Sequence, residues 1–269
     1  MLGRMGWLKD WRRRRIVRKH RIDDALWRQA TRQLASIERL SREEMARLRE
    51  LVLVFLAEKQ FEAAAGMRIT DAMRVSIAAQ ACLLVLELGL DWLGGWTGIV
   101  VYPGDFRVRR TELDETGVLH EWDDDLSGQA LHGGPVVLSW DAAAHDPAMN
   151  VVIHEFAHKL DMLNGEADGL PPLHADMDRR AWTEAFAEAY EGFCDAVDRG
   201  RATWLDPYAA EHPSEFFAVI SEAFFEDPLE TRRRYPDVYQ QLARFYRQDP
   251  AARAGGQEEP GDASSSRLL

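Results

Sequence analysis

The feature that most constrains this chain is an apolar run, VVIHEFAHKLD, at residues 151–161. It contains His154, Glu155 and His158 in the pattern H-E-x-x-H. A spacing of four residues advances a helix by about 400°, so both imidazoles project from one face, about 6 Å apart along the axis. A helix that is apolar on most sides is buried, and a buried His-Glu-His cluster without a metal would leave a carboxylate poorly compensated. The run therefore predicts a buried helix that holds a metal ion.

The residue types indicate which metal and which chemistry. Neutral imidazole nitrogens bind zinc at about 2.0–2.1 Å, and a glutamate next to the first histidine can reach a water on that ion. We therefore predict a metallopeptidase with one Zn2+ per chain, His154 and His158 as ligands and Glu155 as general base. A peptide or protein is the expected substrate.

A catalytic zinc site needs a third protein ligand and one open position. The extended pattern H-E-x-x-H-x-x-G-x-x-H is excluded, because Asp161 and Asn164 occupy its last two defined places. Glu215 and Glu222 are the candidates that remain. They lie seven residues apart in an apolar helical pattern, where an unpaired carboxylate would be costly. Spacing alone leaves both open.

The rest of the chain alternates helical patterns with two short β-rich runs. The run at 99–102 and the run at 135–140 are bounded by proline and glycine and predict strands, and the acidic run 123–125 predicts a solvated loop. The histidine-bearing helix is expected to begin with Asp146 as its cap and Pro147 as its first residue, and to stop at Asn164-Gly165. Helices are predicted over 23–65, 70–87, 147–163, 178–198, 214–226 and 236–247.

Composition excludes several classes of protein. The net charge is −12, which argues against direct nucleic-acid binding. The most apolar stretch, 77–90, is well short of the roughly 20 apolar residues that span a bilayer. Cys82 and Cys194 fit buried free thiols better than a disulfide, and the N-terminal residues lack the apolar core of a secretory signal. We expect a cytoplasmic protein.

The two ends of the chain differ from the middle. Residues 1–22 hold nine Lys/Arg and one Asp, a local charge of +8 against −20 for the remainder. This basic N-terminal arm is expected to be a flexible, solvated tail, and the alternative is contact with an anionic membrane or an acidic partner through Trp7, Leu8 and Trp11. Residues 251–269 are rich in Gly, Ser and Glu and predict a disordered tail.

Four segments carry a family resemblance: GPVVLSW at 134–140, VVIHEFAHKLD at 151–161, DPYAAEHPSEFFAVISEAFF at 206–225 and RFYRQDP at 244–250. With them the chain resembles the Mlc titration factor A family over about residues 25–250. The family consists of bacterial zinc peptidases distantly related to the catalytic domain of anthrax lethal factor. The resemblance implies a mainly helical, zincin-like α+β metallopeptidase with a small sheet whose edge strand lines the active-site cleft. It also implies a helical N-terminal part at 23–95 and a catalytic part at 96–250.

The resemblance extends to particular residues. It implies Glu215 as the third zinc ligand and Tyr208 as an active-site tyrosine that donates a hydrogen bond to the developing oxyanion. Glu222 is then a supporting carboxylate. Thermolysin-like enzymes orient a metal-bound histidine with an Asp four residues after the glutamate ligand, but that position holds Val219. Glu222, Asp161 or a backbone carbonyl could take this role.

Peptidases of this architecture commonly bind an extended substrate along an edge strand, and 134–140 is the candidate strand. Gly133-Gly134 would permit close backbone approach, and the alternative is an ordinary core strand.

The resemblance further implies a peptidase, possibly an aminopeptidase, that also binds the glucose repressor Mlc or a similar protein. The alternative is a non-catalytic binding module that titrates a transcription factor and keeps a structural zinc site. Glu155 favours catalysis, because a purely structural zinc site has no use for a general base at that position.

Overall fold

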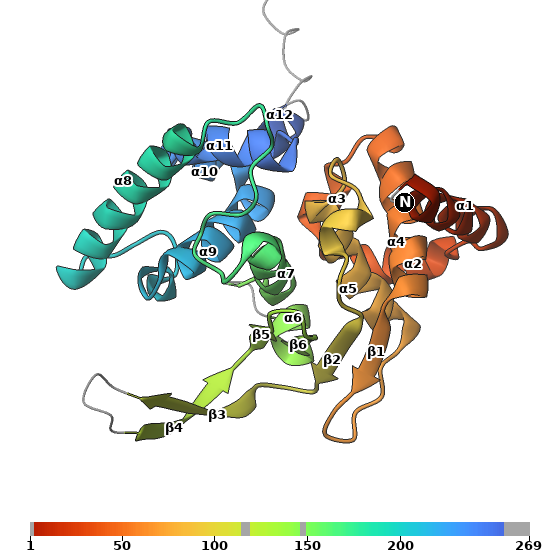
Figure 1. The fold of residues 1–269 in the computed structure, drawn as a ribbon, viewed down its shortest axis with the longest axis horizontal. Helices are drawn as coiled ribbons and strands as arrows, with labels where there is room; N and C mark the ends of the chain where they lie inside the picture. Colours follow the sequence, from red (N-terminus) through yellow and green to blue (C-terminus); the bar gives the residue numbers. More distant parts are fainter. Residues whose placement is uncertain (1–2, 114–118, 146–148, 256–269) are drawn as a thin grey trace, which may run out of the picture.

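The computed structural model describes residues 3–113, 119–145 and 149–255 (Figure 1). Its strands are β1 (Gln60–Ala63), β2 (Gly98–Tyr102), β3 (Phe106–Leu113), β4 (Leu119–Leu126), β5 (Gly128–Ala130) and β6 (Val136–Ser139). Its helices are α1 (Gly3–Lys19), α2 (Asp24–Thr31), α3 (Ala35–Glu38), α4 (Arg42–Glu58), α5 (Asp71–Leu84), α6 (Trp140–His145), α7 (Val151–Asp161), α8 (Arg179–Asp198), α9 (Pro213–Glu226), α10 (Pro228–Arg234), α11 (Pro236–Tyr246) and α12 (Pro250–Gly255). The protein is therefore mainly helical α+β, as predicted.

Helix α7 is the centre of the fold. It packs between α5 and α9, and it also contacts β5 and β6 (Figure 1). All 11 residues of α7 are buried, as are most residues of α5 and α9. A helix that is apolar on all sides needs neighbours on all sides. One apolar cluster accordingly runs through the whole molecule, from Trp27 to Ala251.

The main sheet has the strand order β1-β2-β6-β5. β1, β2 and β6 are parallel, and β5 pairs antiparallel with β6. β6 is therefore internal, and its residues Val136 and Leu138 are fully buried. The prediction that 134–140 is the cleft-lining edge strand is wrong, and its alternative, a core strand, is confirmed. Within the described residues the edge on the side of α7 is β5, a strand of only three residues that carries no pattern of its own.

The ends of α7 show how local capping sets the site. The helix begins at Val151 and not at 147, because the side chain of Asn150 accepts a hydrogen bond from the amide of Ile153 at 3.0 Å. The expected cap, Asp146-Pro147, lies outside the described residues. The helix ends close to the predicted stop, since a short 3-10 turn (Met162–Asn164) leads to Gly165. The side chains of Ser41 and Thr70 cap α4 and α5 in the same way, and α5 stops at Leu84, before the predicted end at 87.

Other segments differ from the sequence predictions. Residues 60–63 form β1 inside the region expected to be helical, because they pair with β2. The acidic run 123–125 lies in β4 and not in a loop. The first residues of the predicted C-terminal tail, 251–255, belong to α12, whose Ala251 is buried, and Arg253 contacts Glu44 of α4 at 2.6 Å. The remaining tail residues lie outside the described part of the chain.

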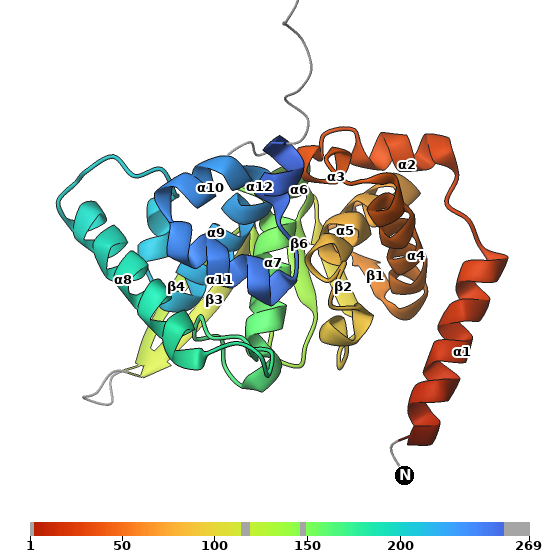
Figure 2. The same cartoon turned by 90° about the horizontal axis from the view of Figure 1, so that it is seen from above.

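The basic N-terminal segment also differs from its prediction. Residues 3–19 form helix α1, which lies beside α4 at the end of the molecule away from α8 (Figure 2). Across the described residues, no helix is both long enough and apolar enough to cross a bilayer. Cys82 and Cys194 are both free thiols, and Cys82 is fully buried.

Candidate metal centre

Two imidazoles of α7 and one carboxylate of α9 converge on a single point. Nε2 of His154 lies 3.2 Å from Nε2 of His158, and Oε2 of Glu215 lies 3.1 Å and 3.2 Å from these two nitrogens. Around a tetrahedral ion with bonds of about 2.0–2.1 Å, neighbouring ligand atoms are about 3.3 Å apart. The triangle therefore has the size of three ligands around one metal ion, and the fourth position remains for a water or a substrate.

A carboxylate behind His154 decides which ring nitrogen faces the centre. Oε1 of Glu222 lies 2.7 Å from Nδ1 of His154. An ionised carboxylate only accepts hydrogen bonds, so Nδ1 carries the proton and Nε2 presents its lone pair to the centre. Burial lowers the pKa of His154, but hydrogen bonds to Glu215 and Glu222 outweigh it and raise that pKa well above its ordinary value. The carboxylates around His154 therefore favour positive charge at the centre, which is the electrostatic environment that a metal cation needs.

Helix α9 provides both carboxylates, and the fold separates their roles. Glu215 lies in the first turn, after Pro213 and the N-cap His212, whose Nδ1 accepts from the amide of Ser214 at 3.2 Å. Glu222 lies seven residues further along the helix. The sequence pattern left both open as third ligand. The structure places Glu215 at the two Nε2 atoms and Glu222 at Nδ1 of one ring.

The same two carboxylates differ in their electrostatics. Burial acts to raise the pKa of Glu215, but its hydrogen bonds to the two imidazoles hold that pKa well below the ordinary value. Burial raises the pKa of Glu222, although the contact with His154 opposes this. The contact with imidazole favours the anionic form of both carboxylates, and this effect is larger at Glu215, which contacts two rings.

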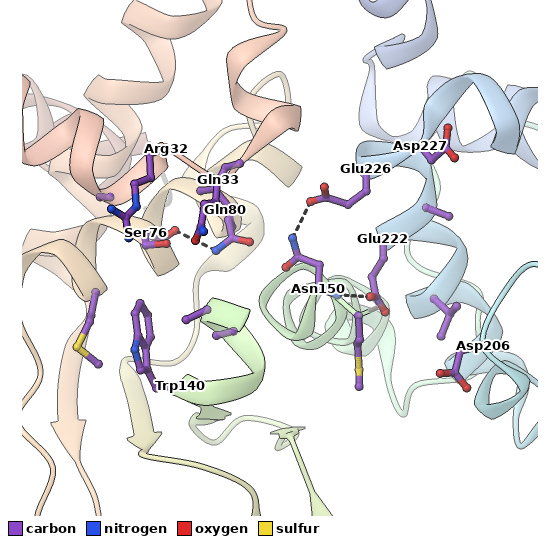
Figure 3. Close-up of a pocket in the computed structure, with 18 of the residues that line it drawn as sticks. Arg32, Gln33, Ser76, Gln80, Trp140, Asn150, Asp206, Glu222, Glu226 and Asp227 are labelled. Atoms are coloured by element: carbon purple, nitrogen blue, oxygen red, sulfur yellow. Dashed lines mark hydrogen bonds between the residues drawn. The ribbon is translucent and has the colours of Figure 1, made fainter. Parts of the chain in front are cut away.

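Glu222 also holds the start of α7. Its Oε2 accepts from the backbone amide of Asn150 at 2.6 Å, and Glu226 accepts from the Asn150 side-chain amide at 2.7 Å (Figure 3). The positive end of a helix dipole favours negative charge at this position. The orientation of His154 and the first turn of α7 therefore depend on one carboxylate.

The other suggested acceptor lies elsewhere. Asp161 is fully buried at the end of α7, where its Oδ2 accepts from the amide of Gly169 at 2.8 Å. Among the described residues, Nδ1 of His158 has no hydrogen-bond partner. Burial raises the pKa of Asp161 to about 6. Asp161 thus braces the loop that follows α7, and Glu222 is the acceptor for His154.

Glu155 lies beneath the backbone of β5. Its side chain is buried, and a Cβ atom at Gly128 would lie 2.4 Å from its Oε1, so only glycine leaves room there. Within the described residues its Oε2 has no hydrogen-bond partner. Burial raises its pKa. A carboxylate in this environment is suited to take up and release a proton.

Tyr208 lies next to the centre, in the 3-10 turn Pro207–Ala210. Its ring centroid is 6.3 Å from that of His154, and 39% of the residue is exposed. Its backbone amide donates to Asp206 at 2.9 Å, which fixes the turn. The ring therefore forms part of the protein surface beside the triangle.

Two residues of the site escaped the sequence analysis. Gly128 is one, and Lys159, the residue after His158, is the other. Nζ of Lys159 donates to the carbonyl oxygens of Leu131 and Gly134 at 2.5 Å and 2.8 Å, in the turn between β5 and β6. Burial lowers its pKa to about 8. The sequence feature that could have identified Lys159 is a lysine inside an apolar run. Its hydrogen bonds attach the β5–β6 turn to α7.

A cavity of about 1010 Å³ lies on the far side of Glu222 (Figure 3). Gln33, in the turn that follows α2, and Gln80 of α5 line one wall, and Glu222 and Glu226 of α9 line the wall opposite. Glu222 thus reaches from this polar cavity to His154.

Comparisons with known proteins agree with this geometry. Residues 8–247 match the model of the family described as glucose-regulated metallo-peptidase M90. Over 220 residues the chain is 38% identical to proteins named Mlc titration factor A from Yersinia pestis (strain Pestoides F) and Yersinia pseudotuberculosis (serotype O:1b, strain IP 31758). This similarity covers 80% of the chain and 81% of each relative. The family match begins inside α1, so part of the basic segment belongs to the region shared with the family.

Proposed function

Because the chain belongs to the glucose-regulated metallo-peptidase M90 family, and is thus a metallopeptidase, we propose that its metal is zinc and that it hydrolyses peptide bonds with Glu155 as general base. His154, His158 and Glu215 would hold the ion. The observation that carries this proposal is the triangle of Nε2, Nε2 and Oε2 atoms at 3.1–3.2 Å. Two imidazoles and one carboxylate are a donor set that suits catalytic zinc.

A zinc ion in this position would supply a Lewis acid that lowers the pKa of a water toward about 7. Glu155 would take a proton from the attacking water and pass it to the leaving amine, and its buried, unpaired Oε2 supports this role. Tyr208 would donate a hydrogen bond to the substrate carbonyl oxygen as negative charge develops there. Glu222 would keep His154 in the tautomer that faces the ion.

The substrate would lie along β5. An extended peptide can add to a free strand edge through main-chain hydrogen bonds. β5 is the edge strand next to α7 in the described sheet, and Gly128 brings its backbone onto Glu155. A peptide paired there would pass the proposed base.

The test compares the wild type with Glu155→Gln on a mixed peptide library, with zinc measured in both. Glu166→Gln, an exposed glutamate in a loop, is the matched control. We expect near one equivalent of zinc in all three proteins, and cleavage by the wild type and the control alone. Cleavage by Glu155→Gln at the wild-type rate would contradict the role of Glu155. Folded wild type without zinc would overturn the metal assignment.

We further propose that the enzyme is an aminopeptidase, which the family resemblance supports. Paired peptides with free and acetylated N-termini test this. An aminopeptidase cleaves only the free member of each pair, whereas equal cleavage of both members would show an endopeptidase.

The name of the relatives supports a second role, binding of an Mlc-like glucose repressor. We expect the wild type and Glu155→Gln to bind such a repressor equally, because binding does not need the base. A binding module without activity is the alternative function, and it predicts zinc and repressor binding with no cleavage even when the repressor is added. Such a repressor acts in the cytoplasm, where free thiols such as Cys82 persist, so we place the protein there.

A further inference from the structure

Helix α1 exposes large apolar side chains to solvent. Trp7, Leu8 and Trp11 are 67%, 57% and 48% exposed, more than any other large apolar side chain in the described part of the chain. Isolated exposed apolar residues are common, but three together, two of them tryptophans, mark an interaction surface.

The opposite face of α1 is fixed to the body of the protein. The guanidinium of Arg13 donates to both carboxylate oxygens of Glu58 at 2.9 Å and 3.0 Å, and to Asp91 at 2.8 Å. Ile16 and Val17 pack against the core. The helix is therefore attached in one orientation, and this orientation directs the tryptophans outward.

The exposed face combines two kinds of side chain. At about 100° per residue, Trp7, Leu8 and Trp11 fall within a sector of about 100°. Arg14, Arg15 and Arg18, all exposed, continue the same sector toward the C-terminal end of the helix. The guanidinium of Arg15 lies 5.5 Å from the ring centroid of Trp11. The outward face is consequently apolar at its N-terminal half and cationic at its C-terminal half.

From this arrangement we propose that α1 binds the surface of an anionic lipid bilayer. Indole rings and leucine insert at the boundary between headgroups and acyl chains, and arginines pair with anionic headgroups. The remainder of the chain, at −20, is repelled by such a surface, so the charge directs contact to α1. A nucleic acid would attract the arginines but would make no comparable use of the exposed apolar cluster. The proposal does not depend on peptidase activity.

The experiment is co-sedimentation of the full chain with vesicles of phosphatidylcholine alone and of phosphatidylcholine with phosphatidylglycerol. One variant, Trp7→Ser/Trp11→Ser, removes the apolar anchors. A second, Arg14→Gln/Arg15→Gln/Arg18→Gln, removes three charges. The matched control, Arg180→Gln/Arg199→Gln/Arg201→Gln, removes three exposed charges from the other end of the molecule.

We expect the wild type and the control to bind vesicles that contain phosphatidylglycerol, and each α1 variant to bind them at least about tenfold more weakly. Tryptophan emission of the wild type should shift to shorter wavelength on binding, and this shift should be absent from the Trp7/Trp11 variant. Wild type that stays in the supernatant would overturn the proposal, and so would a control that loses as much binding as the arginine variant. Equal affinity for duplex DNA, unchanged by the tryptophan substitutions, would point to nucleic acid instead.

Discussion

Helices α7 and α1 both depart from the usual distribution of buried and exposed side chains, and they do so in opposite directions. α7 buries His154, Glu155 and His158 in the apolar centre of the fold, whereas α1 exposes Trp7 and Trp11 to solvent among arginines. Charged groups are normally outside and large apolar groups inside. In α7 the exception is balanced by partners within the chain, since α9 supplies carboxylates. In α1 no described residue covers the apolar cluster, and the partner that we propose for it is a lipid bilayer.

The largest expected effect concerns the buried histidines of helix α7. His158→Ala removes one of the three proposed ligand atoms, and we expect zinc affinity to fall more than about 100-fold, because loss of residues behind the ligands alone costs 10–100-fold. Competition with a chromogenic chelator measures it. The Trp7→Ser/Trp11→Ser variant should keep full zinc affinity. If it lost zinc as well, the two regions would not be independent and the comparison would fail.

Gly128→Ala tests the contact between β5 and Glu155. The new methyl group would lie 2.4 Å from Oε1, so either the strand or the carboxylate must move. We expect peptide hydrolysis to fall at least about tenfold, since small misplacements of catalytic groups are costly. Zinc content should be unchanged. Gly192→Ala, where a methyl group meets open space, is the control, and equal activity in both variants would show that the contact is unimportant.

Glu222→Gln tests whether the Glu222 carboxylate of α9 sets the tautomer of His154. The amide can present a donor to Nδ1 of His154 and so favour the wrong tautomer, and we expect zinc affinity to fall about 10–100-fold. Glu226→Gln, one turn further on, contacts Asn150 but is not placed at His154, and it should have little effect on zinc. Equal losses in both variants would mean that the start of α7, and not the tautomer, controls binding.

The lowered pKa of Lys159 predicts that the stability of the protein depends on pH. Its pKa is about 8 in the folded protein, below the value of an exposed lysine, so the unfolded chain binds more protons between about pH 8 and 10.5. The free energy of unfolding should therefore rise with pH across this window. In Lys159→Met the rise should be smaller, with Lys59, whose pKa is also about 8, as its remaining source. At pH 7 the variant loses two hydrogen bonds to carbonyl groups but also the cost of burying an ammonium, so its free energy of unfolding should change by less than about 1–2 kcal/mol. Urea unfolding at pH 7 and pH 10 measures both, and an unchanged slope would contradict the assignment.

The smallest effect is expected at the base of α1. Arg13→Gln removes partly exposed ion pairs, which contribute up to about 1 kcal/mol. Thermal unfolding should change little, and zinc affinity should not change. A large loss of stability would show that α1 belongs to the core of the protein, whereas the comparison treats it as a helix on the surface.

The sequence was most informative where its signal is local. The four-residue spacing of His154 and His158 depends only on neighbours in the chain, and the structure places the two rings together as predicted. The contact of Glu222 with His154 depends on how α9 crosses α7, which spacing within α9 does not reveal.

The predictions that are wrong concern segments whose structure depends on contacts with distant parts of the chain. β1 and β5 are short, and neither carries a clear alternating pattern, so their strand character comes from pairing with β2 and β6. Gly128 was missed for that reason, and the edge of the sheet was assigned to 134–140. The charge of residues 1–22 predicts a flexible tail, and it does not reveal the contacts that Arg13 and Val17 of α1 make with the body of the protein.

The capping of α7 by α9 has a consequence for how a metal ion arrives. Glu222 and Glu226 hold Asn150 through contacts that do not involve the triangle of ligand atoms. Contacts that do not require an ion therefore fix the position of α9 relative to α7, and the three proposed ligand atoms already lie close together. Metal binding then requires the ion to lose water molecules, but no refolding of the chain. Metal binding would therefore be separate from folding, and the architecture would be the same with and without the ion.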